Sequence, residues 1–145
     1  MAHRGARVIL ACRDLKKATT ARGKLWEIVF TEYSIILQVS CWFVDDIVNQ
    51  TGNSNVVVQH LDTSSLQSVR EFAKELIKRE KRLDILINNA GCAGIGEKKL
   101  TEDGLEYQMA TNYFGHFLLT NLLLGNYSDE IYQLQNWFNH LILLG

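Results

Sequence analysis

Three apolar runs of this sequence each end in a polar group that could bind part of a nucleotide: Arg13, Asp62 with Thr63, and Asn88-Asn89-Ala90-Gly91. An arginine after a strand can hold a phosphate in a fork of donors. An aspartate after the next strand can accept a hydrogen bond from an adenine amino group, and an Ala-Gly pair lets a ligand approach the backbone. Each group also has a structural alternative: Arg13 as a surface charge, Asp62 as a helix-start residue, and Asn-Asn-Ala-Gly as a turn. Their occurrence after three successive strands favours one shared site.

The three runs have the character of buried strands, and helices are expected between them. Arg7–Cys12, Val56–Leu61 and Asp84–Ile87 are short and rich in aliphatic residues. After the second run, Ser64 or Ser65 can cap a helix. Its apolar residues fall on one stripe: Leu66, Val69, Phe72, Ala73, Leu76 and Ile77. This alternation predicts an α/β fold with parallel strands, in which ligands bind beyond the carboxyl ends of the strands.

Further helices are expected on either side of this central part. Thr101–Leu124 is heavily apolar and begins with a capping threonine and two acidic residues, so a long helix is predicted there. Asp14 can cap a helix after the first strand. A second helical stretch resumes at Asp45 and is expected to end at Gly52.

Two segments continue no α/β pattern. Gly23–Val44 is rich in aromatic and β-branched residues without a clear period, and the tail from Gly125 continues no obvious strand–helix alternation. Removing the first segment would join its flanks into one helix with Leu15, Ala18 and Ile47 on one face, which predicts an insertion inside that helix. Because both segments begin abruptly at a glycine, our hypothesis is that they derive from non-coding read-through or alternative exons.

The composition excludes several classes of protein. The chain has 145 residues, 15 basic and 16 acidic side chains, 47% apolar residues and no proline. This length suits one domain or part of a larger one, and so apolar a chain is not disordered. Its near-neutral charge argues against a dedicated binder of nucleic acid or of a membrane surface. A proline-rich linker is excluded as well.

The chain shows no metal-binding pattern and no targeting segment. Three cysteines at wide spacing and four scattered histidines form no ligand set, so no metal site is expected, and the cysteine pattern suits a reducing compartment. The N-terminus lacks the apolar core of a signal peptide, and the most apolar stretch, Tyr33–Val44, is too short to span a membrane. We expect an intracellular protein, in the cytoplasm or at the cytoplasmic face of a membrane.

Longer motifs surround the three polar groups: Arg4–Asp14, Leu61-Asp62, Leu86–Gly91 and Thr111–Thr120. The most specific combination is Asn-Asn-Ala-Gly after an apolar strand, followed by Asn-x-x-Gly-His-Phe-Leu-Leu-Thr from Asn112. Over residues 4–22 and 45–124 the chain thereby resembles the short-chain dehydrogenases/reductases, specifically their retinol-dehydrogenase-like branch. The resemblance implies a doubly wound Rossmann-type parallel sheet with helices on both faces. It also implies NADP-dependent interconversion of an alcohol and a carbonyl, with a small lipophilic substrate.

The resemblance assigns roles to individual residues. Arg13 matches the position that favours NADP by pairing with the 2′-phosphate. Asp62 matches the acid that contacts adenine, with Thr63 beside it, and Asn89-Ala90-Gly91 matches the motif next to the adenosine ribose. Asn112 matches the helix asparagine of the catalytic tetrad, where it supports a proton relay through a lysine and water. The alternative for Asn112 is a polar residue that bonds within its own helix.

The chain departs from the family pattern in two places. The family's first strand and its Thr-Gly-x-x-x-Gly-Ile-Gly turn should precede Arg4, and they are absent. The glycines of Gly91–Gly96 only look similar, because they follow a later strand and precede no helix start. The catalytic Tyr-x-x-x-Lys pair is also missing, and no lysine follows Lys99. We therefore expect a partial fold that lacks the first strand and the C-terminal half, in a chain that is truncated and inactive.

The missing first strand predicts a gap in the sheet. In the family order 3-2-1-4-5 that strand lies between those corresponding to Arg7–Cys12 and Asp84–Ile87. Unpaired backbone groups there are costly, so either Gly23–Val44 or the tail must fill the gap, or the domain is incomplete.

The expected layout is a partial dinucleotide-binding domain over 1–124, interrupted by an atypical insert over 23–44 and followed by an atypical tail over 125–145. Three functions stay open at this point. The chain could belong to an oxidoreductase, or it could be a non-catalytic interaction protein that docks as a homo-oligomer or family-member dimer through helix 101–124. It could also be an unstable fragment without a function of its own.

Overall fold

A computed structural model describes residues 2–13, 34–38, 44–92, 97–127 and 132–135. In it, five strands form one sheet in the order β3-β1-β2-β4-β5, and every neighbouring pair is parallel. The strands are β1 (Arg7–Cys12), β2 (Ser34–Gln38), β3 (Val56–His60), β4 (Ile85–Asn88) and β5 (Tyr132–Gln135). The expected α/β fold with a parallel sheet is confirmed.

The gap expected in the middle of the sheet is filled by β2. This strand comes from the atypical segment 23–44, and it pairs with β1 on one side and with β4 on the other. Ile36 is the register partner of both Ile9 and Leu86. Backbone groups that would otherwise be unpaired in the sheet interior therefore have partners. The edge strand β5 likewise comes from the tail after Gly125.

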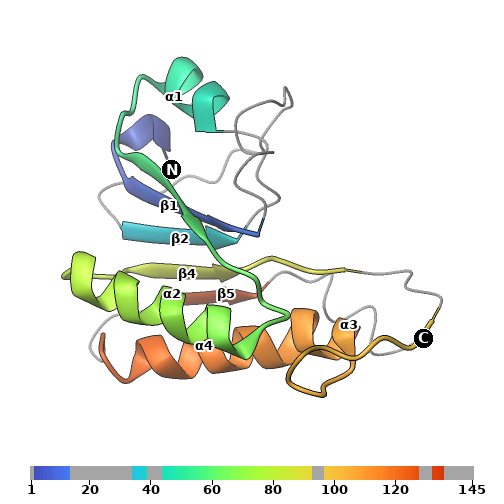
Figure 1. Ribbon diagram of the computed structural model, residues 1–145. Helices are drawn as coiled ribbons and strands as arrows, with labels where there is room; N and C mark the ends of the chain where they lie inside the picture. Colours follow the sequence, from blue (N-terminus) through green and yellow to red (C-terminus); the bar gives the residue numbers. More distant parts are fainter. Residues whose placement is uncertain (1, 14–33, 39–43, 93–96, 128–131, 136–145) are drawn as a thin grey trace.

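Helices cover both faces of the sheet (Figure 1). They are α1 (Val44–Thr51), α2 (Leu66–Arg79), α3 (Tyr107–Met109) and α4 (Gly115–Leu124), with a π-helical turn over Ala110–Phe114 and a 3₁₀ turn over Ala2–Arg4. Ile9 and Leu86 point into a core shared with α2 and α4, whereas Val8 and Ile87 point into a second core on the side of α1. The alternation follows from the two-residue period of a strand, and it explains why both faces are apolar.

Two helix ends match the sequence-based expectations. Ser65 is the N-cap of α2, and its hydroxyl accepts a hydrogen bond from the backbone N–H of Ser68 at 3.3 Å. Gly52 follows α1 with a φ of 68°, and its N–H donates to the Val48 carbonyl at 2.8 Å. The hypothesis that α1 continues a helix containing Leu15 and Ala18 falls on residues outside the described ranges.

The prediction of a long helix over 101–124 was wrong about the start of the helix, which lies at Tyr107 rather than at Thr101. Thr101 instead closes a tight turn, in which Gly104 adopts a φ of 74° and donates its N–H to the Thr101 carbonyl at 3.0 Å. The cap is Glu106, whose two carboxylate oxygens accept from the backbone N–H groups of Gln108 and Met109 at 2.9 and 2.7 Å. A carboxylate that reaches two free amides fixes the helix start there.

Two further observations concern the expectations about cysteines and membrane segments. Cys12, at the end of β1, is disulfide-bonded. We did not expect a disulfide there, because the three cysteines are widely spaced in the sequence. Among the described residues, no helix is both long and apolar enough to cross a membrane.

Candidate functional site

The candidate site lies at the carboxyl edge of the sheet, where the chain leaves β1, β3 and β4. Arg13 follows β1, Asp62 follows β3, and Asn89 to Cys92 follow β4. Because the neighbouring strands are all parallel, these three segments leave the sheet at the same edge.

Arg13 is exposed and has a partner that sequence reasoning missed. Its Nη1 donates a hydrogen bond to the Tyr107 hydroxyl at 2.5 Å. This bond is the largest cause of the raised pKa of Arg13. The two residues are 94 positions apart, so no local spacing could have paired them.

Asp62 has the structural role that was considered for it. Its Oδ1 accepts from the backbone N–H and the hydroxyl of Ser64, at 2.9 and 2.6 Å, which builds the turn before α2. The structural alternative is therefore correct for this oxygen. Asp62 follows β3 at the carboxyl edge of the sheet, and its contact with adenine stays a prediction.

Thr63 lies beneath this edge and packs against α4. It is 4% exposed, and its backbone lies directly against Gly115, the first residue of α4. A Cβ at position 115 would lie 2.9 Å from the Thr63 carbonyl carbon, which is closer than side chains approach. The Thr63 side chain therefore positions the helix, and its predicted part in cofactor binding stays a prediction.

The segment that follows β4 is fastened to the helix by a regular ladder of hydrogen bonds. The Asn88 side-chain amide donates to the Thr120 hydroxyl at 3.1 Å, and the Ala90 carbonyl lies 2.7 Å from Nε2 of His116. Beyond them, the Cys92 backbone bonds to Asn112.

The spacing of this ladder has a geometric cause. Its partners advance by two residues along the extended segment and by four residues back along the helix. Two extended residues span about 6.6 Å and four helical residues about 6.0 Å, so the two periods match. Rungs at every second residue leave Asn89 and Gly91 between them, at the carboxyl edge.

Asn112 contributes the last rung through its whole side-chain amide. Its Oδ1 accepts from the Cys92 N–H at 2.8 Å, and its Nδ2 donates to the Cys92 carbonyl at 2.9 Å. The alternative of a bond within its own helix is therefore wrong. Asn112 sits in the middle of the π-helical turn, where Gly115 donates its N–H to the carbonyl of Ala110. Such turns occur often at functional sites.

His116 forms the middle rung of this ladder. The histidines were considered above only as metal ligands, and His116 was assigned no structural role. It is 3% exposed, and a carbonyl can only accept, so Nε2 carries the hydrogen toward Ala90. Burial lowers the pKa of His116, and the bond to Ala90 opposes that shift. The imidazole is therefore neutral at pH 7 and acts as a structural donor rather than as a proton carrier.

The remaining predicted residues lie at the same edge. Asn89 and Ala90 are half-buried and Gly91 is exposed, so the edge can be reached from solvent. Gly94 and Gly96 lie outside the described residues. In the ranges the structure describes, no three His, Cys, Asp or Glu residues gather as metal ligands would.

Comparison with known proteins identifies the family and the fold of this chain. The family model described as short chain dehydrogenase matches residues 43–130. This chain belongs to the short-chain dehydrogenase family. A metagenomic short-chain oxidoreductase, solved in complex with NADP, superimposes with a TM-score of 0.61 over 92% of this chain and 53% of that chain. At 19% sequence identity, that structure supports the fold alone.

Within the short-chain dehydrogenase family, the chain is similar to the retinol-dehydrogenase-like branch. Retinol dehydrogenase 13 of Homo sapiens is 44% identical over 124 residues, which are 86% of this chain and 30% of that protein. Retinol dehydrogenase 14 of Mus musculus is 46% identical over 121 residues, or 83% of this chain and 32% of that protein. The chain thus spans about a third of the length of the curated relatives that it matches.

Proposed function

We propose that this chain forms the adenosine side of an NADP site in an alcohol/carbonyl oxidoreductase. The observation that carries the proposal is that an exposed arginine, Arg13, follows β1 at the same edge of the parallel sheet where Asp62 follows β3 and Asn89 to Cys92 follow β4. An exposed guanidinium at this edge suits a 2′-phosphate, because its planar fork of donors matches phosphate oxygens. Membership of the short-chain dehydrogenase family supports a nicotinamide cofactor.

The residues around Arg13 fit the rest of the adenosine. The Asp62 carboxylate lies on the side of β3, where it can accept from the adenine amino group. Gly91 is exposed, and it offers no side chain to obstruct a ribose near the end of β4. The ladder to the helix holds this backbone in place before any ligand arrives, which lowers the ordering cost of binding.

Hydride transfer by these 145 residues alone is not part of the proposal. When bound, a nicotinamide cofactor supplies the hydride. The proton must come from an acid, and the family uses a tyrosine with a lysine four residues later. None of the five tyrosines has such a lysine, and no lysine follows Lys99. Asn112 in this chain holds the Cys92 backbone. We infer that the chain binds cofactor without turning it over.

The substrate class follows only from the similarity to retinol dehydrogenases. We propose a small lipophilic alcohol or carbonyl compound for the enzyme to which this sequence belongs. NADPH oxidation with all-trans-retinal tests the proposed inactivity of this chain. No turnover is expected from the 145-residue chain, and measurable turnover would contradict the proposed inactivity.

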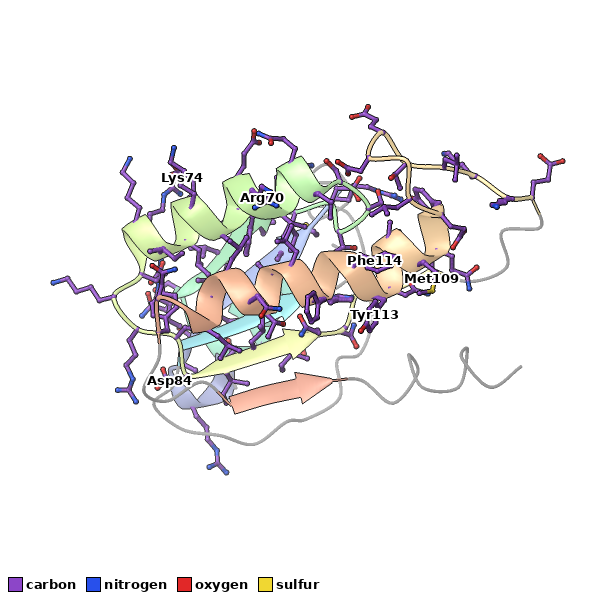
Figure 2. The ribbon with its side chains drawn as sticks, turned by 90° about the horizontal axis from the view of Figure 1, so that it is seen from below. Arg70, Lys74, Asp84, Met109, Tyr113 and Phe114 are labelled. Carbon is purple, nitrogen blue, oxygen red and sulfur yellow. The ribbon has the colours of Figure 1, made fainter. Side chains whose placement is uncertain are left out.

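Binding of NADPH to the intact chain tests the cofactor assignment. Isothermal titration should give a dissociation constant for NADPH that Arg13→Gln weakens by about tenfold, because one charge-assisted contact is lost. Arg70→Gln is the matched control, since Arg70 is an exposed arginine on α2 (Figure 2). Equal affinities of the Arg13 and Arg70 variants would refute the role of Arg13.

A second candidate function is self-association through α3 and α4. Tyr113 and Phe117 stack with ring centroids 6.2 Å apart while they are 48% and 59% exposed. Figure 2 shows Met109, Tyr113 and Phe114 gathered at one end of this helix. We propose a second copy of the chain as the occupant, because a stacked aromatic pair can pack against its own symmetry mate. Sedimentation should show a dimer that Phe117→Lys dissociates; a monomeric wild-type chain would exclude this function.

A further inference from the structure

Tyr107 lies between two cations at the carboxyl edge. Its hydroxyl accepts from Nη1 of Arg13 at 2.5 Å, and the Nζ of Lys99 lies 4.9 Å from the centroid of its ring. We propose that Tyr107 and Lys99 complete, together with Arg13, a subsite for a phosphomonoester on a ribose. The inference rests on the proposed NADP site and assigns two further residues to it, with Tyr107 as a positioning residue for Arg13.

The backbone holds Lys99 and Tyr107 opposite each other. The Tyr107 N–H donates to the Lys99 carbonyl at 2.8 Å, and the neighbouring residues Leu100 and Glu106 form an antiparallel bridge. The Glu106 carboxylate caps the helix at the next residue. Lys99 therefore has little backbone freedom to lose when an anion binds.

The chemistry of the three side chains suits an anion. An exposed arginine commonly pairs with a carboxylate, which neutralises its charge and occupies its fork. A neutral phenol oxygen takes up one N–H of Arg13 and leaves its charge intact. The hydroxyl hydrogen of Tyr107 can then donate to a phosphate oxygen. The ring face attracts the Lys99 ammonium, so two positive charges lie on one tyrosine.

The surroundings of Arg13 are consistent with this subsite. Asp62 is the acidic side chain that acts on Arg13 through its charge, and its Oδ1 is already bonded to Ser64. Arg13 and Lys99 are both exposed, and Tyr107 is half-buried. A phosphate can therefore reach both cations from solvent. At physiological salt, charges are screened over about 8 Å, so both cations act on an anion placed between them.

The test compares dinucleotides that differ only in the 2′-phosphate. Dissociation constants for NADPH and NADH are measured by isothermal titration on the intact chain. Tyr107→Phe and Lys99→Gln should each raise the dissociation constant of NADPH by about fivefold and leave that of NADH unchanged. Lys99→Arg should restore NADPH binding, because it keeps the positive charge. Lys74→Gln, which changes an exposed lysine on α2, is the matched control and should change neither constant.

Adenosine 2′-phosphate, adenosine 5′-phosphate and inorganic phosphate separate this inference from the proposed function. The wild-type chain should prefer the 2′-phosphate, and Tyr107→Phe should reduce that preference. If Tyr107→Phe weakens the binding of NADPH and of NADH equally, Tyr107 only stabilises the loop and the inference is wrong. If NADPH binds and neither variant changes it, the inference fails while the proposed function stands. If the wild-type chain binds no dinucleotide and does not prefer the 2′-phosphate, both are overturned.

Discussion

The side chain of Asn112 bonds to both polar groups of Cys92, the N–H at 2.8 Å and the carbonyl at 2.9 Å. The pair joins the segment after β4 to the π-helical turn, so the helix and the carboxyl edge of the sheet are positioned together. This arrangement explains why an asparagine is needed at position 112, since only a side-chain amide offers one donor and one acceptor side by side.

Loss of this pair should destabilise the fold. Asn112→Ala leaves the Cys92 N–H and carbonyl without their partners, so the free energy of unfolding should fall by about 1–2 kcal/mol. Urea denaturation of the variant measures the change. Asn121→Ala is the control, because the side chain of the exposed Asn121 bonds to the Phe117 carbonyl of its own helix and alanine favours helix. Equal losses of unfolding free energy in the two variants would show that the bonds to Cys92 do not stabilise the fold.

The close approach of Gly115 to Thr63 predicts a larger effect. Gly115→Ala places a Cβ 2.9 Å from the Thr63 carbonyl carbon, so α4 must move away from β3. The expected cost is about 3 kcal/mol, as in other overpacked cores. At Gly125 the nearest atom would be 3.6 Å from an added Cβ, and φ is −64°. Gly125→Ala should therefore be neutral or stabilising by about 0.5 kcal/mol. Thermal melts that rank the two variants in the opposite order would contradict this geometry.

His116 should make stability depend on pH. Burial lowers its pKa from the ordinary value of 6.5, so the unfolded chain binds the proton more readily than the folded chain. Stability is therefore full above about pH 6.5 and declines as the pH falls toward the folded pKa. His116→Gln, which has no titrating ring, should lose this part of the pH dependence. Urea midpoints between pH 7.5 and 5 check it, and parallel curves for both proteins would rule out the histidine as the cause.

Arg7 and Glu80 should contribute to stability through geometry rather than charge alone. Nε and Nη2 of Arg7 donate to the two oxygens of Glu80 at 2.8 and 2.7 Å, which links the start of β1 to the end of α2. Arg7→Lys keeps the charge but cannot form the fork, so we expect a loss of about 0.5–1 kcal/mol. Arg79, exposed and 3.5 Å from Glu75, is the matched control. Arg79→Lys should change the denaturation midpoint by less; an equal change would show that the fork has no extra effect.

The strands and the carboxyl edge could be predicted because they depend on local pattern. The bounds of β1 match the expected run, and Arg13, Asp62 and the Asn-Asn-Ala-Gly motif follow from the rule that parallel strands gather their carboxyl ends. The ladder between the segment after β4 and the helix could not be predicted in this way, because Ala90 and Cys92 contribute backbone groups rather than side chains to it.

Other features depend on contacts that no local pattern contains. β2 lies in a segment without a clear period, and its place is decided by the unpaired groups of β1 and β4. The bond between Arg13 and Tyr107 spans 94 residues. The helix was expected to begin at Thr101, whereas Glu106 is the cap in the structure because its carboxylate reaches two backbone amides.

The most direct test of the central claim is a map of the NADPH site by backbone amide shifts. NADPH is titrated into the isotopically labelled 145-residue chain, and the amide signals are followed at every residue. The proposed site predicts that the shifts gather at Arg13, Asp62, Asn89 to Cys92 and Tyr107, and that Arg70 and Lys74 on α2 stay unchanged. Shifts confined to α2, or no shifts at saturating NADPH, would contradict the assignment of this edge as a cofactor site.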